Sequence, residues 1–181
     1  SDFLAVRVYA HAARPNRQAN DREDFAETLY WHAGVKTDDR GMAVAEFALS
    51  DSVTSFRVSA DAFSSDGVLA GNSITIDSVK PFYMEPKLPL EVTSGDHLQI
   101  PLGLVNATSK RLEQGRLKVL GLNEPRSVEF ALEADARKRI LVDMLIGNSV
   151  GDQEITLDGS LDGRIDKITR KFVVKPRGFP I

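Results

Sequence analysis

Apolar and polar positions alternate along much of the chain, and the alternation is clearest in residues 96–106. One face of a strand there would carry four apolar side chains: Leu98, Ile100, Leu102 and Leu104. Because successive side chains of a strand point to opposite sides of a sheet, this period of two predicts a half-buried strand. Pro101 has no N–H to donate to a neighbouring strand, so we expect the strand to lie at an edge or to bulge there.

The same alternation, interrupted by turns rich in Gly, Asp and Pro, predicts an all-β chain of antiparallel sheets. Residues 54–63 form a second clear pattern, with an apolar side chain at every second position, which is typical of a half-buried strand. The strands predicted before Pro81 are residues 3–10, 25–32, 42–49, 54–63 and 68–78. Those predicted after it are residues 90–93, 97–106, 115–122, 127–132, 138–146, 154–161 and 164–174.

Turn residues separate these strands. Asp and Gly accept the backbone angles of tight turns, which predicts turns at residues 38–41 and 65–67. Asp162-Gly163 predicts a two-residue hairpin. Residues 13–24 are polar without apolar spacing and predict a mobile loop. Residues 131–139 contain good helix formers that could make one helical turn, but the period of two resumes after them and favours a strand.

The strand pattern divides the chain near Pro81 into two β-sandwich domains of the fibronectin-III or immunoglobulin type, residues 1–80 and 81–181. Such sandwiches need about seven strands to close two sheets over a core. The second domain has that number, whereas the first is short of it and is expected to be incomplete. Three prolines, which fix the backbone angle φ, are expected to stiffen the connection: Pro81, Pro86 and Pro89.

Composition narrows the class of protein further. The chain has 42% hydrophobic and 27% charged residues, as in an ordinary globular protein. No apolar run approaches the ~20 residues that span a bilayer. The start at Ser1, without a signal peptide, is typical of a cut made inside a longer protein. The net charge of −3, without a basic stripe, argues against a nucleic-acid surface. Since the chain has no Cys, it cannot supply a disulfide, a thiol nucleophile or an internal thioester.

No residue of the sequence is assigned to a catalytic, cofactor-binding or metal site, because no motif for such chemistry is found. The three histidines are too scattered for a metal-ligand motif, and a structural or surface role is favoured for them: His11, His32 and His97. Three aspartates are reminiscent of a calcium loop, but their spacing does not match an EF-hand and each lies near a turn: Asp158, Asp162 and Asp166. The match of Asn106-Ala107-Thr108 to a glycosylation site is expected to be chance.

Two aromatic segments each have two interpretations. Trp31, the chain's one Trp, either anchors a core or a domain junction or belongs to an exposed aromatic platform with Tyr30 for a sugar or a partner, and the anchor is favoured. Residues 3–10 are either a strand or the downstream end of a protease-accessible segment, and the strand is favoured. If strands are missing before it, this edge would expose unpaired backbone groups and allow self-association.

Residues 22–57 carry the most specific pattern of the chain. It combines Arg-x-x-Phe-x-Glu-Thr, an aromatic pair ending in Trp, Thr-Asp-x-x-Gly, and a strand that ends in Leu-x-Asp-Ser-x-Thr-x-x-Arg. This pattern resembles the segment that follows the bait region in alpha-2-macroglobulins, the large protease-trapping proteins. Two positions depart from it, Ser50 in place of Pro and Phe56 in place of Trp. The residues that match are Arg22, Phe25, Glu27, Thr28, Trp31, Thr37, Asp38, Gly41, Leu49, Asp51, Ser52, Thr54 and Arg57.

The resemblance continues into the second half through Lys80-Pro81-Phe82, Leu88-Pro89, Gly95-Asp96 and Asn106, and then rests on strand spacing and the closing residues 173–178. The sequence of residues 27–38 is most similar to bacterial members of the alpha-2-macroglobulin family, particularly the MagD type that lacks a reactive thioester. The resemblance implies two consecutive macroglobulin domains, the first of them following the bait region. It further implies a structural and non-enzymatic role, without a cofactor, in a periplasmic or secreted protease inhibitor.

In such an inhibitor the partners would be proteases, met by the full-length protein, and other domains of the same chain. The domains here would frame the bait and relay its cleavage to a change of shape that traps the protease. The alternative function is an Ig-like adhesin or carbohydrate-binding module of a surface protein. Such a module would group exposed aromatic side chains on one face, and the sequence, with 7% aromatic residues, has no evident cluster.

Overall fold

The computed structural model of the chain describes residues 7–121 and 125–178. The chain divides into two compact units, Ser1–Ser52 and Val53–Ile181, which we call the N-terminal unit and the C-terminal unit. All regular secondary structure in the described residues is β-strand, as the alternation predicts. The described part of the chain contains no helix with the length and apolar character of a membrane span.

The N-terminal unit contains little regular structure. Its strands are β1 (Val8–Ala10), β2 (Asp21–Arg22) and β3 (Tyr30–His32). β1 and β3 pair antiparallel, with Tyr9 opposite Trp31. Of the strand predicted at residues 25–32, the last three residues form β3. Residues 3–6 of the first predicted strand lie outside the described residues.

The strand predicted at residues 42–49 is wrong, because this segment is extended chain without a ladder. Individual main-chain bonds hold it instead. The N–H of Ala48 donates to the carbonyl of His11 at 2.8 Å, and Met42 accepts the N–H of Asp38 at 2.8 Å. The turn predicted before it is confirmed, since the Asp38 carboxylate accepts the N–H groups of Arg40 and Met42 and Gly41 has a φ of +75°.

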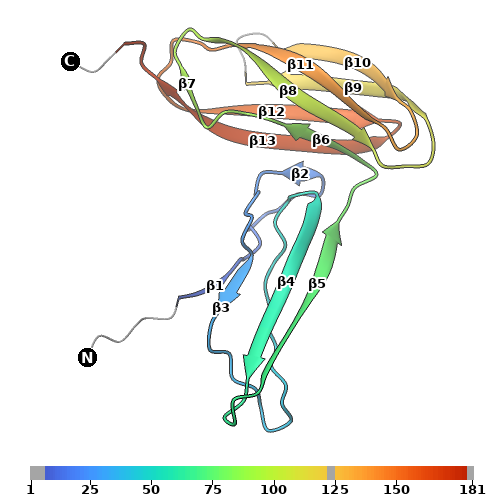
Figure 1. Cartoon of the computed structure of the whole chain (residues 1–181). Helices are drawn as coiled ribbons and strands as arrows, with labels where there is room; N and C mark the ends of the chain where they lie inside the picture. The colour runs from blue at the N-terminus through green and yellow to red at the C-terminus, as the bar shows by residue number, and fades with distance from the viewer. Residues whose placement is uncertain (1–6, 122–124, 179–181) are drawn as a thin grey trace. The chain divides into compact units, whose positions relative to one another are not determined.

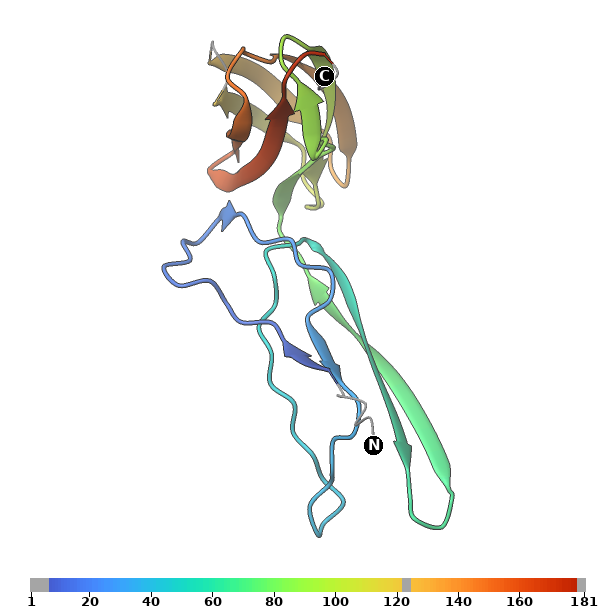
Figure 2. The ribbon, with the colours of Figure 1, turned by 90° about the vertical axis from the view of Figure 1, so that its left-hand side faces the viewer.

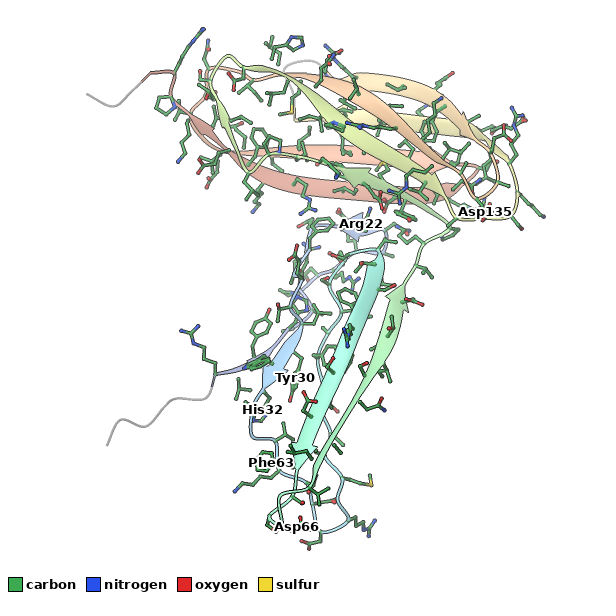
Figure 3. The ribbon with its side chains drawn as sticks, viewed as in Figure 1. Arg22, Tyr30, His32, Phe63, Asp66 and Asp135 are labelled. Carbon is green, nitrogen blue, oxygen red and sulfur yellow. The ribbon has the colours of Figure 1, made fainter. Side chains whose placement is uncertain are left out.

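The C-terminal unit begins with a long hairpin of β4 (Thr54–Phe63) and β5 (Leu69–Ser78), visible as a two-stranded ribbon in Figure 2. The pair runs without a bulge from Thr54 opposite Ser78 to Phe63 opposite Leu69. Its tip contains Asp66, which lies beyond Phe63 in Figure 3, and Gly67 with a φ of +88°. The hairpin therefore confirms both predicted strands and the turn between them.

The burial predicted for this hairpin is only partly present. Phe56 and Val58 are half-buried, but Ile74, which lies opposite Val58, is exposed. At the tip, 81% of Phe63 is exposed. The physical reason is that, among the strands of residues 7–121 and 125–178, β4 and β5 pair only with each other. A two-stranded ribbon brings no second sheet of its own to cover its apolar face.

The rest of the C-terminal unit is a β-sandwich of two sheets (Figure 1). Its strands are β6 (Phe82–Pro86), β7 (Glu91–Thr93), β8 (His97–Asn106), β9 (Leu112–Leu120), β10 (Arg126–Leu132), β11 (Arg137–Leu145), β12 (Gly151–Leu161) and β13 (Arg164–Lys175). One sheet has the order β10-β9-β12-β13, with β7 added parallel to β13, and the other has the order β11-β8-β6.

The core of the sandwich lies between the two sheets. Its fully buried side chains come from both of them: Phe82, Met84, Leu102, Leu104, Leu117, Met144, Leu161 and Ile168. Gly159 of β12 lets the sheets approach closely, since a Cβ there would lie 2.6 Å from the sulfur of Met84. The alternating apolar positions of β8 thus predict its inward face correctly, with Leu98 half-buried and Ile100, Leu102 and Leu104 buried.

The segment after Pro81 differs from its prediction as a stiff connection. Residues 82–86 form β6, which pairs antiparallel with β8, and Phe82 and Met84 are fully buried. Burial of both side chains on one face explains why the segment belongs to the sandwich. The predicted division of domains between residues 80 and 81 stays a prediction, although the first strand of the sandwich begins close to it at Phe82.

Pro101 lies in the central strand of its sheet and not at an edge, because β8 pairs with β11 on one side and β6 on the other. Its carbonyl accepts the N–H of Lys87, at 2.9 Å, just beyond the end of β6. The side of Pro101 that lacks a donor thus faces the point where the neighbouring strand stops, which is how a central strand accommodates it.

Two other turns follow from their sequences. Asp162 and Gly163 both have positive φ angles, 45° and 78°, between Leu161 and Arg164, as the predicted hairpin requires. Between β10 and β11 the chain makes a turn with Asp135 at a φ of 49°, and residues 131–139 contain no helical turn.

Candidate functional site

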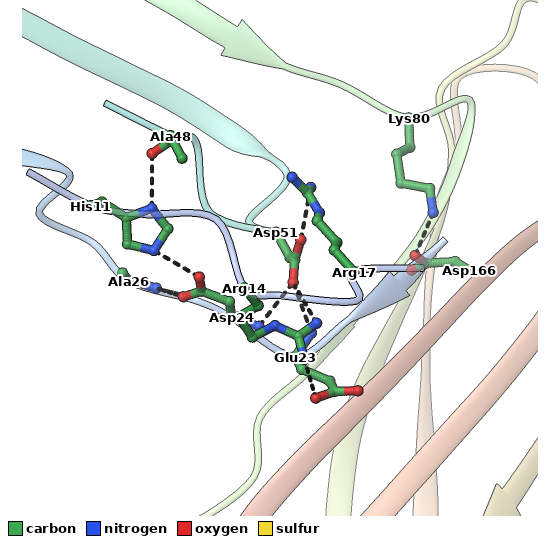
Figure 4. Close-up of polar contacts among 10 residues, drawn as sticks. All are labelled: His11, Arg14, Arg17, Glu23, Asp24, Ala26, Ala48, Asp51, Lys80 and Asp166. Carbon is green, nitrogen blue, oxygen red and sulfur yellow. Dashed lines mark hydrogen bonds and ion pairs between the residues drawn. The ribbon is translucent and has the colours of Figure 1, made fainter. Parts of the chain in front are cut away.

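A polar cluster centred on two buried side chains, His11 and Asp51, joins segments of the N-terminal unit (Figure 4). We call it the polar clasp, and it consists of His11, Arg14, Arg17, Glu23, Asp24 and Asp51. It lies mostly in the polar segment 13–24, for which the sequence predicts a mobile loop. In the structure this loop is instead tied by charged side chains to residues 48–51.

His11 connects three segments of the chain. Its Nδ1 lies 2.8 Å from the carbonyl oxygen of Ala48, and its Nε2 lies 2.7 Å from Oδ2 of Asp24. Its backbone N–H donates to the carbonyl of Leu29 at 2.7 Å. Only 9% of the residue is exposed. The structural role that the sequence favours for His11 agrees with these contacts.

Asp51 is the acceptor at the centre of the clasp. Its Oδ2 accepts the backbone N–H groups of Glu23, at 3.1 Å, and of Asp24, at 3.0 Å. Arg17 lies 2.7 Å from Oδ1 and Arg14 lies 3.4 Å from Oδ2. The Asp51 side chain is 3% exposed, so its charge is compensated by two cations and two backbone donors rather than by water.

The pKa of Asp51 is lowered by these contacts. Burial alone would raise the pKa, because it penalises the charged carboxylate. The backbone N–H groups of Asp24 and Glu23, followed by the charges of Arg17 and Arg14, outweigh burial and bring the pKa below its ordinary value. The clasp therefore holds Asp51 ionised.

Aromatic contacts flank the clasp. The guanidinium of Arg22, which is buried, lies 5.8 Å from the centre of the Phe25 ring. The ring of Tyr30 lies 5.6 Å from that of Phe47, and its hydroxyl lies 3.3 Å from Nδ1 of His32. Figure 3 shows Tyr30 and His32 on β3. These contacts place Arg22 and Phe25 of the signature pattern in the framework of the unit.

Trp31 does not anchor a core within the described residues, so that part of the favoured interpretation is wrong, and a place at a domain junction stays a prediction. The side chain is 59% exposed, whereas its neighbour Tyr30 is half-buried. Adjacent residues of a strand face opposite sides, and Tyr30 takes the covered side. Trp31 shares the open face with Tyr9, which lies directly opposite it on β1 and is also exposed.

The other candidate ligands do not come together. His32 lies in the N-terminal unit and His97 in the sandwich, where its Nε2 is 3.8 Å from Asp143. The Asp162 carboxylate accepts the N–H groups of Glu113 and Gln114, at 3.2 and 2.9 Å, while Asp158 is half-buried on β12. Within residues 7–121 and 125–178, no group of three or more His, Asp or Glu could hold a metal ion.

Asp166 has a structural role that the sequence does not reveal. It is fully buried, accepts the N–H of Met84 at 2.8 Å and forms an ion pair with Lys80, also at 2.8 Å. Lys80 lies between β5 and β6, so the pair fixes the entry of the chain into the sandwich. An Asp on the inward face of β13 is the only signal that the sequence offers for this contact.

Asn106 is also structural, although it begins a match to a glycosylation site. It is fully buried, and its Nδ2 donates to the carbonyls of Lys110 and Glu133, both at 2.8 Å. Its Oδ1 accepts the hydroxyl of Thr108 at 2.7 Å. The side-chain amide of Asn106 thus joins two turns of the sandwich by hydrogen bonds. Because it is fully buried, a glycan could not be attached to it in the folded state.

The arrangement as a whole joins separate segments of the N-terminal unit. The clasp pairs its carboxylates with arginines, a histidine and backbone donors. Sequence reasoning identifies Asp51 as part of the signature pattern but not as the centre of a cluster. A signal for the cluster exists in the opposite charges crowded between residues 14 and 24, but nothing in the spacing shows that they converge on Asp51.

Comparison with known proteins gives the family. The model of the alpha-2-macroglobulin family matches residues 28–119. An alpha-2-macroglobulin of Thermotoga maritima is 33% identical over 124 residues, which is 68% of this chain. An alpha-2-macroglobulin homolog of a Nostoc species is 25% identical over 164 residues, or 86% of this chain. This chain spans about 8% of the length of each of these relatives.

The fold has a counterpart among solved structures. A crystal structure of a mutant of Salmonella alpha-2-macroglobulin aligns with a TM-score of 0.52 at 19% identity, over 77% of this chain and 10% of the other. At this identity the likeness concerns the fold, and it agrees with the all-β sandwich described above. The family match extends from the N-terminal unit through the hairpin into the sandwich, and the chain belongs to the alpha-2-macroglobulin family.

Proposed function

We propose that this chain is a structural part of a protease inhibitor, in which its two macroglobulin domains frame the bait region and relay its cleavage. The observation that carries the proposal is the family match over residues 28–119, which includes most of the signature segment. The role is non-enzymatic. Its partners are proteases, met by the full-length protein, and the other domains of that protein.

The state of the first domain supports this proposal. Its N-terminal unit has only short strands, and an exposed face carries Trp31 and Tyr9. The hairpin that follows also exposes apolar side chains, among them Ile74 and Phe63. Exposed apolar surface on this scale is typical of a site that meets another part of the protein. A domain completed by a neighbouring segment can respond when that segment is cut.

The inhibitory role is tested with the full-length parent protein and a protease of broad specificity. We expect cleavage of the parent in its bait region, a more compact particle by small-angle scattering, and slower hydrolysis of a large protein substrate by the captured protease. A matched sample in which the protease is chemically inactivated should show neither the cut nor the compaction. Unchanged hydrolysis and an unchanged particle after cleavage would rule out the proposed inhibitor.

Location and self-association are part of the same proposal. An inhibitor that meets foreign or stray proteases acts at the cell envelope, so we place the parent protein in the periplasm or outside the cell, which fractionation of the source cells would test. In the isolated chain, the exposed edge of the first domain allows self-association. β1 has only three residues and one partner, β3, within the N-terminal unit as described, which supports an open edge.

The family match does not support the alternative function of an adhesin or carbohydrate-binding module. Tyr9 and Trp31 form one exposed aromatic pair rather than a row of stacking rings. We therefore retain the inhibitor as the single proposed function.

A further inference from the structure

The two ring nitrogens of His11 both face oxygen atoms that can only accept a hydrogen bond. Nδ1 lies 2.8 Å from the carbonyl of Ala48, and a carbonyl has no proton to give. Nε2 lies 2.7 Å from Oδ2 of Asp24. A neutral imidazole has one donor and one acceptor nitrogen, so it could satisfy only one of these contacts and would direct a lone pair at the other oxygen.

The Asp24 carboxyl is better suited to be the ionised partner than the proton donor. Its Oδ1 already accepts the N–H of Ala26 at 3.2 Å, and a hydrogen bond of this kind favours the carboxylate. The Asp24 backbone N–H donates in turn to Asp51, which is compensated by Arg14 and Arg17. A proton on Nε2 of His11 would therefore satisfy the contact with Oδ2 of Asp24.

We propose that His11 is a doubly protonated, buried imidazolium, and that the polar clasp is a pH-sensitive latch that opens when Nδ1 loses its proton. The charge-assisted bond to the Asp24 carboxylate keeps the proton on Nε2. Deprotonation of Nδ1 would leave two electron pairs facing each other across 2.8 Å in a site with little access to water, and the ring would then have to leave Ala48. The latch thus closes at low pH and opens as the pH rises.

Opening would separate segments that are distant in the sequence. The backbone of His11 donates to Leu29 and accepts the N–H of Ala48, so the same residue holds these segments by its side chain and its main chain. The charged groups linked to His11 within the described residues are Asp24 directly, and Asp51, Glu23, Arg14 and Arg17 through it. Together they carry three acidic and three basic side chains, counted with His11, so loss of one proton leaves the clasp with an unbalanced negative charge.

The test is a pH series on the 181-residue chain, with the ring nitrogens of His11 observed by long-range ¹H–¹⁵N NMR. Amide exchange of Ala48 and Asp24, corrected for the intrinsic rate at each pH, reports the state of the latch. We expect both nitrogens to be protonated while the latch is closed. The loss of the Nδ1 proton should coincide with a fall of about 10-fold or more in the protection of Ala48, the size associated with a charge-assisted hydrogen bond.

Two variants keep the outcome interpretable. Asp24→Asn offers a side-chain N–H to Nε2, so we expect a neutral His11 protonated on Nδ1 and a protection of Ala48 that no longer changes with pH. His97→Gln removes an exposed histidine of the sandwich and should leave the profile of the full chain unchanged. The proposal would be overturned if a ring nitrogen of His11 lost its proton while the Ala48 amide stayed protected from exchange. It would also be overturned if the protection of Ala48 did not change at the pH at which His11 loses its proton. This inference does not depend on the proposed inhibitory function.

Discussion

At the scale of single residues, Asp51 shows why the signature segment has the residues it has. One carboxylate satisfies two backbone N–H groups and two arginines, so the segment 14–24 is fixed without a regular sheet. We expect Asp51→Asn to lower the free energy of unfolding by roughly 2 kcal/mol, because the amide keeps some hydrogen bonds but leaves the arginines uncompensated. Thermal and urea unfolding of the chain would measure the loss. Asp39→Asn, at an exposed turn position, is the matched control and should change stability little.

The same residue predicts how stability depends on acid. The pKa of Asp51 is lowered in the folded state relative to an unfolded value of about 3.9. Its stabilising contribution is therefore present above the unfolded pKa and is lost as the pH falls through the lower folded pKa. We expect the wild-type chain to lose stability below about pH 4. The Asp51→Asn variant should lose less over the same range, and parallel acid profiles for the two chains would contradict the assignment.

Lys80 and Asp166 provide a second test at this scale. Asp166 is fully buried, so Lys80→Met removes a cation 2.8 Å from a carboxylate without access to water. We expect a destabilisation of about 3 kcal/mol. Asp166→Asn and the double variant complete a double-mutant cycle, in which the two effects should couple rather than add. Additive effects would show that the pair contributes nothing beyond its separate side chains.

At the scale of elements, two glycines set how closely backbone and side chains approach in the sandwich. A Cβ on Gly159 would meet Met84, whose thioether can move, at 2.6 Å. A Cβ on Gly115 would lie 2.4 Å from the backbone carbonyl of Phe130, which cannot move without disturbing β10. We expect Gly159→Ala to cost about 1 to 3 kcal/mol, as overpacking does, and Gly115→Ala to cost more. Chemical denaturation of both variants decides the order, and the reverse order would refute this account of the packing.

Elements with a strong period of two could be predicted from the sequence. The bounds of β4 and β8 agree with the prediction, and Asp162-Gly163 forms the predicted hairpin. The prediction of strands failed where neighbouring segments determine whether a segment pairs. Residues 42–49 alternate like a strand but have no ladder partner, and β6 is hidden among prolines although Phe82 and Met84 are fully buried. The polar clasp could not be predicted because its contacts join residues up to 37 positions apart.

At the scale of the whole molecule, the N-terminal unit and the β4–β5 hairpin each expose apolar side chains. Trp31, Tyr9, Ile74 and Phe63 are exposed in the isolated chain, and β1 leaves an open edge. We expect the isolated 181-residue chain to self-associate with increasing concentration in sedimentation velocity runs. A Val8→Pro variant, which removes a backbone donor from β1, should weaken the association. A monomer at every concentration would argue against an open edge.

Above all, we propose that this chain frames a bait region in its parent protein and relays the cleavage of that region. Hydrogen exchange of the parent protein, measured by mass spectrometry before and after a protease cuts the bait, tests it most directly. We predict that peptides covering residues 8–51 and the β4–β5 hairpin change their exchange after the cut, while the core strands β8, β9 and β12 of the sandwich keep theirs. Unchanged exchange in residues 8–78 after complete cleavage would contradict the claim.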